Sequence, residues 1–395
     1  MAAISGEGTK TSQTPGMSGV IPLKWMLGLF GFLLRSGGEL TRLVGEMHHA
    51  VSLSPPPFAA RTELDSDKAH KTYLLLRLAL EYGADHLHQW SATMQSLPNT
   101  PQTARRMQAA MNGVMGDKLQ AWGNPLRLHM ELVDHEGSEV DPDTMQQGKG
   151  LVLFVHGLCL SEWDWQGRQH HYFVEEMKQQ GFGVAWLRYN TGLPIWENGA
   201  ALAQLLESVW QGDNERKLVL VGHSMGGLVI RSALHYGSDS DLRWLGDVSH
   251  MACLASPHAG APLEKLGNFA NSLLGVSPYS KPLMALGNIR SLGIRSLRHG
   301  AIHPSMAEGG EAPASALPES LSVLLLAARI GTDPARHWIG DGLVPVASAL
   351  SEDHFPPQHA AVKRVLLDDV GHLRLLQDSR TYQSLRDWLA VTAKP

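Results

Sequence analysis

The sequence of 395 residues predicts an α/β protein built on a mostly parallel sheet with helices on both faces. From about residue 123 onward, short apolar runs alternate with amphipathic helical segments. Strands that are covered on both faces read as continuous apolar runs, which is typical of parallel sheets. The composition, with 43% hydrophobic and 18% charged residues, fits a globular enzyme rather than a disordered, fibrous or membrane-spanning chain.

The expected elements follow one another in alternating order through a domain that covers residues 123–395. Strands are predicted at 126–132, 150–156, 182–189, 217–222, 248–255, 322–330 and 361–367, and helices at 170–180, 197–211, 225–236 and 381–390. Between Pro257 and Pro318 the alternation stops. Because long insertions above a sheet are usually functional, residues 258–318 are expected to form a cap.

The first third of the chain has a different pattern. Residues 1–20 are small and polar and predict a disordered tail. Residues 21–122 predict a helical region, with helices at 39–51 and 71–97 on either side of three consecutive prolines. This N-terminal helical appendage carries no catalytic signature.

One apolar segment within that region, Trp25 to Leu34, is flanked by Lys24 and Arg35. Ten apolar residues are too few to span a bilayer, which takes about 20 in a helix. The segment also lacks the small-residue cleavage site of an export signal. We expect a helix docked on the protein's own core; the alternative is peripheral contact with a membrane through residues 23–35.

Charge and cysteine content exclude several classes of protein. The formal net charge is −5 and no basic block is present, so nucleic acid is not an expected partner. Cys159 and Cys253 are too few for a disulfide framework, and their apolar neighbours predict buried, inert thiols. A cytoplasmic location is therefore expected, with or without attachment to a membrane surface.

No metal or cofactor site is predicted. The nearest group of potential ligands is Asp164, His170 and His171. Adjacent histidines on a helix face different directions, and the spacing fits no common ligand set.

The segment Gly222-His223-Ser224-Met225-Gly226 matches G-x-S-x-G. It follows the apolar strand at 217–222 and opens the helix at 225–236, which is the context that this motif requires. A serine on such a sharp turn is strained, and the glycines leave room for it. We therefore predict Ser224 as a nucleophile, exposed above the sheet at the amino end of a helix.

A nucleophilic serine needs two amide donors for the oxyanion that forms during acyl transfer. The amide of Met225, directly after the serine, is expected to be the first. The second is expected from Leu158, because Gly157 lets the chain turn after the strand at 150–156. His156 and Gly157 are expected to shape this part of the substrate pocket.

The acid and the base of such a site follow the serine in chain order. Asp341 lies between two glycines in a loop after the strand at 322–330, so its carboxylate can point back into the site. The rival carboxylates fit turns or polar loops: Asp333, Asp353, Asp368 and Asp369. His372 follows the strand at 361–367 and is the expected base, and His258 is expected to line the mouth of the site.

Five ordered motifs resemble α/β-hydrolase lipases and esterases, in particular the bacterial lipase-like and GPI inositol-deacylase-like (PGAP1-like) group. They are VHGL (155–158), GHSMGG (222–227), ASPHAGAPLEKLG (255–267), GDGLVPV (340–346) and GH (371–372). The resemblance covers residues 126–395 and implies the α/β-hydrolase fold, with Ser224, Asp341 and His372 as the triad. Ser256 stands where such lipases have Thr, a mild departure.

The resemblance implies hydrolysis of carboxylic esters, with an acyl or lipid-like group, through an acyl-enzyme. Acyl transfer to an alcohol would use the same triad, and amide or thioester substrates also fit it. A non-catalytic, membrane-associated scaffold that retains the fold is the third hypothesis. It is disfavoured because all three triad positions are filled.

Overall fold

The structure is a computed structural model of the chain. It describes residues 23–53, 66–92, 102–141, 145, 148–210, 216–275, 291–307, 310, 317–318, 320–333, 339–355 and 361–392. The predicted tail at 1–20 and the run of prolines at 55–57 lie outside the described residues, as do parts of the predicted cap.

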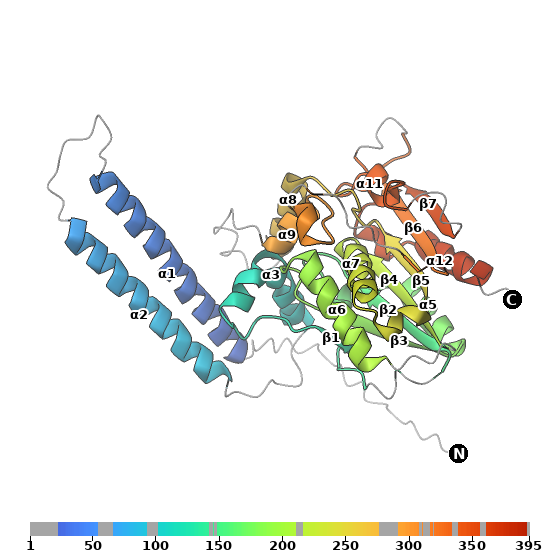
Figure 1. Cartoon of the computed structure of the whole chain (residues 1–395), viewed down its shortest axis with the longest axis horizontal. Helices are drawn as coiled ribbons and strands as arrows, with labels where there is room; N and C mark the ends of the chain where they lie inside the picture. Colours follow the sequence, from blue (N-terminus) through green and yellow to red (C-terminus); the bar gives the residue numbers. More distant parts are fainter. Residues whose placement is uncertain are drawn as a thin grey trace, which may run out of the picture.

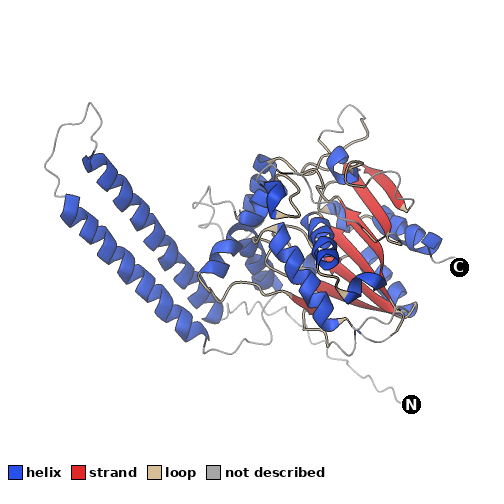
Figure 2. Ribbon diagram, in the orientation of Figure 1, coloured by secondary structure: helices blue, strands red, loops and turns tan. Residues whose placement is uncertain are grey.

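A sheet forms the centre of the body, with helices around it (Figure 2). It has seven strands in the order β1-β3-β2-β4-β5-β6-β7. Every neighbouring pair is parallel except β1 and β3 at one edge. The strands are β1 (Glu131–Val133), β2 (Gly150–Val155), β3 (Phe182–Arg188), β4 (Lys217–His223), β5 (Val248–Leu254), β6 (Ser322–Arg329) and β7 (Val362–Asp368). The expected α/β-hydrolase architecture is therefore confirmed, and six of the seven strands lie within one or two residues of their predicted bounds.

The first predicted strand, at 126–132, is wrong over most of its length, because β1 begins only at Glu131. The backbone groups before it are satisfied by a helix instead of a neighbouring strand. Asn112 donates from Nδ2 to the oxygen of Leu126 at 2.8 Å, and its Oδ1 accepts from the amide of Leu128 at 2.9 Å. This side chain takes the place of a strand partner.

Helices cover both faces of the sheet. Successive side chains along a strand point to opposite faces, so the buried side chains fall into two hydrophobic clusters, one on each face. One cluster contains Leu153 of β2 and residues of α6 and α7, and the other contains Phe154 and residues of α5 and α12. The helices of the body are α3 (Gln102–Ala121), α5 (Arg168–Gln179), α6 (Ile195–Val209), α7 (Met225–Asp239), α8 (Leu263–Gly275), α9 (Leu292–Leu297), α10 (Pro304–Ala307), α11 (Val346–Leu350) and α12 (Ser379–Thr392), with the 3₁₀ turns η1 (Glu162–Trp165), η2 (Arg243–Asp247) and η5 (Arg374–Leu376).

Helix α3 lies within the predicted helical region at 21–122, but it packs as part of the body. Its residues Met111, Met115 and Leu119 are buried in the same cluster as the strands. A Cβ on Gly113 would lie 2.2 Å from the sulfur of Cys159, so the helix packs closely on the loop after β2. The predicted boundary at 122/123 marks a change in sequence pattern. Helix α3 lies before this boundary and nevertheless shares a hydrophobic core with the strands after it.

Helices α1 (Leu23–Leu53) and α2 (Ser66–Ala92) form an antiparallel hairpin that extends away from the body (Figure 1). The two helices approach closely, because a Cβ on Gly45 would lie 3.0 Å from Cβ of Tyr73. At its base, the fully buried ring of Phe32 lies 5.5 Å from the ring of Trp122. Asn124 also donates to the oxygen of Gly28 at 3.0 Å.

The apolar segment at 25–34 therefore docks by one face only. Leu27 and Phe32 are buried, whereas Met26, Phe30 and Leu33 are 53%, 62% and 44% exposed. None of the helices in the described ranges is both long and apolar enough to cross a membrane. The exposed half of the segment is thus an apolar stripe on the outer side of α1.

Candidate active site

Ser224 lies at the turn between β4 and α7, at the carboxyl edge of the sheet. Its backbone has φ 55° and ψ −123°, a region that L-residues rarely adopt and that stores strain. The amide of Ser224 donates to the oxygen of Leu254 at 2.8 Å, which ties the turn to β5. The predicted strain is confirmed, but the predicted exposure is not, since only 5% of Ser224 is exposed.

Two glycines make the turn sterically feasible. A Cβ on Gly222 would lie 2.4 Å from the amide nitrogen of Gly227, and one on Gly226 would lie 2.2 Å from the oxygen of Val155. Both contacts are with backbone atoms, and moving the backbone to relieve them would cost much free energy. The motif therefore requires glycine at both positions for the reason predicted.

The loop after β2 approaches the serine from one side. A Cβ on Gly157 would come within 2.9 Å of Cβ of Ser224, so only glycine lets the loop pass so close. The loop turns over Gly157 to Leu160, where the amide of Leu160 donates to the oxygen of Gly157 at 3.2 Å. Within the described ranges, neither the amide of Leu158 nor that of Met225 donates to a hydrogen-bond acceptor.

Asp341 is almost completely buried in the loop after β6. Its Oδ1 accepts from the amides of Leu343 at 3.0 Å and Val344 at 2.8 Å. Its Oδ2 accepts from Nδ1 of His372 at 2.6 Å. The carboxylate is thus fixed by three donors and points at the imidazole.

This bond decides which nitrogen of His372 is free. An ionised carboxylate can only accept, so Nδ1 is the donor in this bond, and in the neutral tautomer of the ring Nε2 carries the lone pair. Nε2 is buried and has no hydrogen-bond partner among the described residues. It makes no hydrogen bond with Ser224 Oγ either; such bonds are often long before a substrate binds.

The rival carboxylates lie elsewhere. Asp368 accepts from Nε of Arg329 at 2.5 Å, and that arginine is only 8% exposed. Asp369 is exposed and has φ 59°. Neither contacts His372 in the structure as described.

His223, the second residue of the motif, connects the serine turn to the loop of His372. Its ring lies 4.7 Å from the ring of His372, and its Nε2 donates to the backbone oxygen of His372 at 3.1 Å. Burial, and then the charge of His372, hold the pKa of His223 well below its usual value, so the ring stays neutral. The sequence motif placed His223 on the turn but did not reveal this contact, which spans 149 residues.

We predict that His223→Phe lowers kcat about tenfold with little change in KM, because a ring without a donor no longer holds the loop of His372 in place. Steady-state kinetics on a soluble ester, with the melting temperature as a check on folding, would measure this. His250→Phe is a matched control, because His250 is also a buried histidine but packs against Trp388 at a ring distance of 5.0 Å. Full kcat in a folded His223→Phe protein would show that the bond is dispensable.

Two further histidines predicted near the pocket are structural in the fold. His156 is buried, stacks on Tyr189 at 4.6 Å, and its backbone oxygen accepts from the Tyr189 hydroxyl at 2.6 Å. Burial lowers its pKa. The side chain therefore supports the loop of Gly157 from behind.

The expectation that His258 lines the mouth of the site is wrong. His258 is 0% exposed and packs edge-to-face against Phe355 at 4.9 Å. Its Nδ1 accepts from Nη1 of the buried Arg231 at 3.4 Å. It was predicted at the mouth because it begins the cap in sequence, but its side chain turns inward beneath α11, where the oxygen of Ser348 also accepts from its amide at 3.2 Å.

Phe269 is a site residue that the sequence analysis missed. It lies on α8 of the predicted cap, and its ring lies 6.0 Å edge-to-face from His372. The only signal was its place in an apolar stretch without strong periodicity. Much of the cap, including 276–290, lies outside the described residues. Among the described residues, no group of three potential metal ligands gathers.

The prediction for the cysteines is confirmed. Both Cys159 and Cys253 are buried and free. Burial raises the pKa of both thiols, that of Cys253 to about 12. Neither thiol has the character of a nucleophile at neutral pH.

Comparison with known proteins finds one family model, the PGAP1-like alpha/beta domain, which matches residues 200–308. The match includes Ser224 and ends before Asp341 and His372. A curated relative, the lecithin-cholesterol acyltransferase-like 4 protein of Arabidopsis thaliana, is 28% identical over 128 residues. That alignment covers 32% of this chain and 22% of the relative, so the two share about a fifth of the relative's length.

Solved structures with a similar fold include lipase BlEst2 of Bacillus licheniformis, at 18% identity and a TM-score of 0.43, covering 67% of this chain and 98% of that one. A thermophilic esterase of Thermogutta terrifontis is similar at 17% identity and a TM-score of 0.38, and the alignment covers 68% of this chain and 94% of that one. Mouse alpha/beta hydrolase domain-containing protein 10 is similar at 15% identity and a TM-score of 0.38, and the alignment covers 67% of this chain and 95% of that one. The fold assignment itself rests on strand order and register.

The PGAP1-like match lies over the same strand, turn and helix that hold the strained serine in the sheet. The strand order gives the chain the α/β-hydrolase fold, and residues 200–308 within it are similar to the PGAP1-like alpha/beta domain.

Proposed function

We propose that the protein hydrolyses carboxylic esters, with Ser224 as nucleophile, His372 as base and Asp341 as the acid that orients the base. The observation that carries this proposal is the bond of 2.6 Å from His372 Nδ1 to Asp341 Oδ2. It leaves Nε2 as a buried lone pair without a partner in the described ranges. The strained serine lies at the same edge of the sheet, next to His223 that contacts His372.

In the proposed reaction, Ser224 Oγ attacks the ester carbonyl carbon while its proton moves to His372 Nε2. The carbonyl oxygen becomes an oxyanion, which the unpartnered amides of Leu158 and Met225 stabilise. His372 then gives its proton to the leaving alcohol, and an acyl-serine forms. Water attacks this ester in the same way and releases the carboxylic acid.

An acyl group with an apolar chain suits the surroundings of the base, because Phe269 of α8 covers His372 with an apolar ring. A series of p-nitrophenyl esters of increasing chain length tests both the activity and this preference. Turnover that rises from acetate to longer chains supports a lipid-like substrate. No turnover with any ester of the series would contradict the proposal and favour the non-catalytic scaffold.

Acyl transfer is the second candidate function, and the named acyltransferase-like relative favours it. In that case an alcohol takes the place of water in the second half of the reaction. The two activities differ in their products. With an ester substrate and an added alcohol, a transferase yields mainly the new ester, whereas a hydrolase yields mainly the free acid.

We further propose that the exposed stripe of α1 contacts a membrane surface, since Met26, Phe30 and Leu33 present apolar side chains to solvent. Phe30→Glu/Leu33→Glu is expected to abolish co-sedimentation with phosphatidylcholine and phosphatidylglycerol vesicles while leaving the hydrolysis of soluble esters unchanged. Leu75→Glu is a matched control, because Leu75 is 67% exposed on α2. A wild-type protein that does not sediment with vesicles would exclude membrane contact and leave the docked face of α1 as its role.

A further inference from the structure

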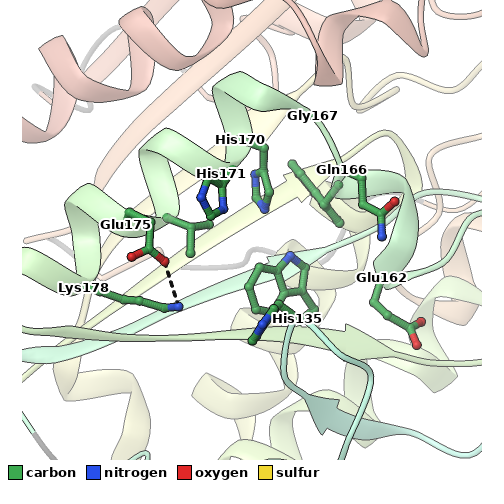
Figure 3. A pocket seen from close by; sticks show the side chains of 11 residues that line it. His135, Glu162, Gln166, Gly167, His170, His171, Glu175 and Lys178 are labelled. Atoms are coloured by element: carbon green, nitrogen blue, oxygen red, sulfur yellow. Dashed lines mark hydrogen bonds and ion pairs between the residues drawn. The ribbon is translucent and has the colours of Figure 1, made fainter. Parts of the chain in front are cut away.

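A cavity of about 270 Å³ lies between η1, α5 and β3, on the face of the sheet that α5 covers (Figure 3). Trp165 and Trp186 form apolar walls, and Val174 adds to them. Its volume is near the lower end of the ~300–1,000 Å³ range of small-molecule sites. None of the residues that line it belongs to the proposed triad or oxyanion hole.

His170 reaches from α5 into this cavity (Figure 3). It is only 5% exposed, and neither of its ring nitrogens has a hydrogen-bond partner in the described part of the chain. Its other neighbours are aromatic rings, such as Phe154 at 4.7 Å and Tyr382 at 5.8 Å, and the Tyr382 hydroxyl donates elsewhere, to Leu376. Trp165 Nε1 is likewise buried without a partner among the described residues.

Such groups are costly to bury, because a polar atom without a partner loses its hydration and gains nothing in return. Burial, and then the charge of His171, lower the pKa of His170 to about 3, so the ring is neutral. A neutral imidazole has one donor and one acceptor nitrogen. A hydroxyl group, which both donates and accepts, can pair with either nitrogen.

The charges around the cavity are already paired. Glu162 accepts from Arg188. Glu175 pairs with Lys178 at 3.0 Å, and the dashed line in Figure 3 marks this pair. No charged side chain is thus left for an ionic ligand to neutralise among those that line the described cavity. Two indole walls favour a flat aromatic body, since aromatic rings stack or pack edge-to-face with one another.

We propose that this cavity binds a small, neutral aromatic molecule with one hydroxyl group, a phenol or an aromatic alcohol, whose hydroxyl pairs with His170. This cavity is separate from the proposed triad, so the binding proposal can be tested independently of ester hydrolysis. It also explains why α5 carries a histidine where an apolar residue would satisfy the packing.

The probe is 2-naphthol, with 2-naphthoate as a charged analogue of similar shape. Calorimetry is expected to give saturable binding of 2-naphthol to the full chain and at least tenfold weaker binding of 2-naphthoate. His170→Phe keeps the ring but removes both nitrogens, and it should weaken 2-naphthol binding about tenfold. His250→Phe is the matched control, because His250 is also a buried histidine but packs on Trp388 and does not line the cavity, and it should bind within twofold of wild type.

A second readout separates this role from a purely structural one. Without ligand, His170→Phe should melt about 2 °C above wild type, because it removes two unpaired polar atoms from an aromatic cluster. At the same 2-naphthol concentration, the melting temperature of wild type should rise by more than that of His170→Phe, because ligand stabilisation grows with the ratio of ligand concentration to Kd. Equal binding by the two proteins, or no saturable binding by wild type, would overturn the proposal.

If His170→Phe does not fold, the wild-type protein still decides the question. In protein labelled with ¹⁵N-tryptophan, 2-naphthol should shift the indole N–H signal of Trp165, assigned by its loss in Trp165→Phe. Shifts confined to other indoles would place the probe elsewhere and contradict the proposal.

Discussion

Ser224→Ala is expected to lower ester hydrolysis by about 10⁴- to 10⁶-fold, the range found when triad members are removed from serine hydrolases. The fold should be retained, because Ser224 Oγ makes no hydrogen bond within the described part of the chain and the substitution removes a single oxygen. The measurement is kcat/KM on the best p-nitrophenyl ester, with the melting temperature recorded for both proteins.

Ser249→Ala is the matched control for this substitution, because Ser249 lies at the amino end of β5, at the opposite edge of the sheet from the turn. It should keep full activity. A fluorophosphonate probe gives an independent result, since it should label wild type at Ser224 and should not label Ser224→Ala. Near-normal turnover by a folded Ser224→Ala protein would remove the nucleophile from the proposal.

Asp341→Asn is expected to lower turnover by roughly 10⁴-fold. An amide at this position no longer stabilises the positive charge that forms on His372, and it can turn its NH₂ group toward Nδ1. That would favour the tautomer with the proton on Nε2, which cannot take a proton from Ser224. The fold should survive, because an amide oxygen can still accept from Leu343 and Val344.

Asp369→Asn is the matched control. Asp369 is exposed and has φ 59°, a conformation that asparagine tolerates well, so both activity and stability should stay close to wild type. If Asp341→Asn keeps activity while Asp369→Asn loses it, the assignment of the acid is wrong. The bond between Asp341 and His372 would then be a structural one.

Much of the fold follows from local patterns that the sequence states directly. The apolar runs of β2, β4, β5 and β6 predict their strands within one or two residues, because these strands are buried on both faces. The strained turn at Ser224 is equally local, since glycine spacing and the change from strand to helix lie within one segment. These features depend on residues that are neighbours in the chain.

Other features were missed because distant residues create them. Asn112 of α3 satisfies the backbone at Leu126 and Leu128 and so replaces most of a predicted strand. Helix α3 lies within the predicted helical region at 21–122, but its packing on the loop of Cys159, where a Cβ on Gly113 would lie 2.2 Å from the sulfur, was not apparent from the sequence. His258 was misplaced because the chain alone does not show which way a side chain turns.

The sequence by itself determined the class of fold, the strands, the serine turn and the candidates for acid and base. Only the tertiary structure decided which carboxylate contacts His372, that His223 holds the base from 149 residues away, and that His170 faces a cavity rather than solvent. The physical reason is the range of the interactions involved. Strand burial and turn strain act between adjacent residues, whereas contacts between loops arise only when the sheet brings its carboxyl ends to one edge.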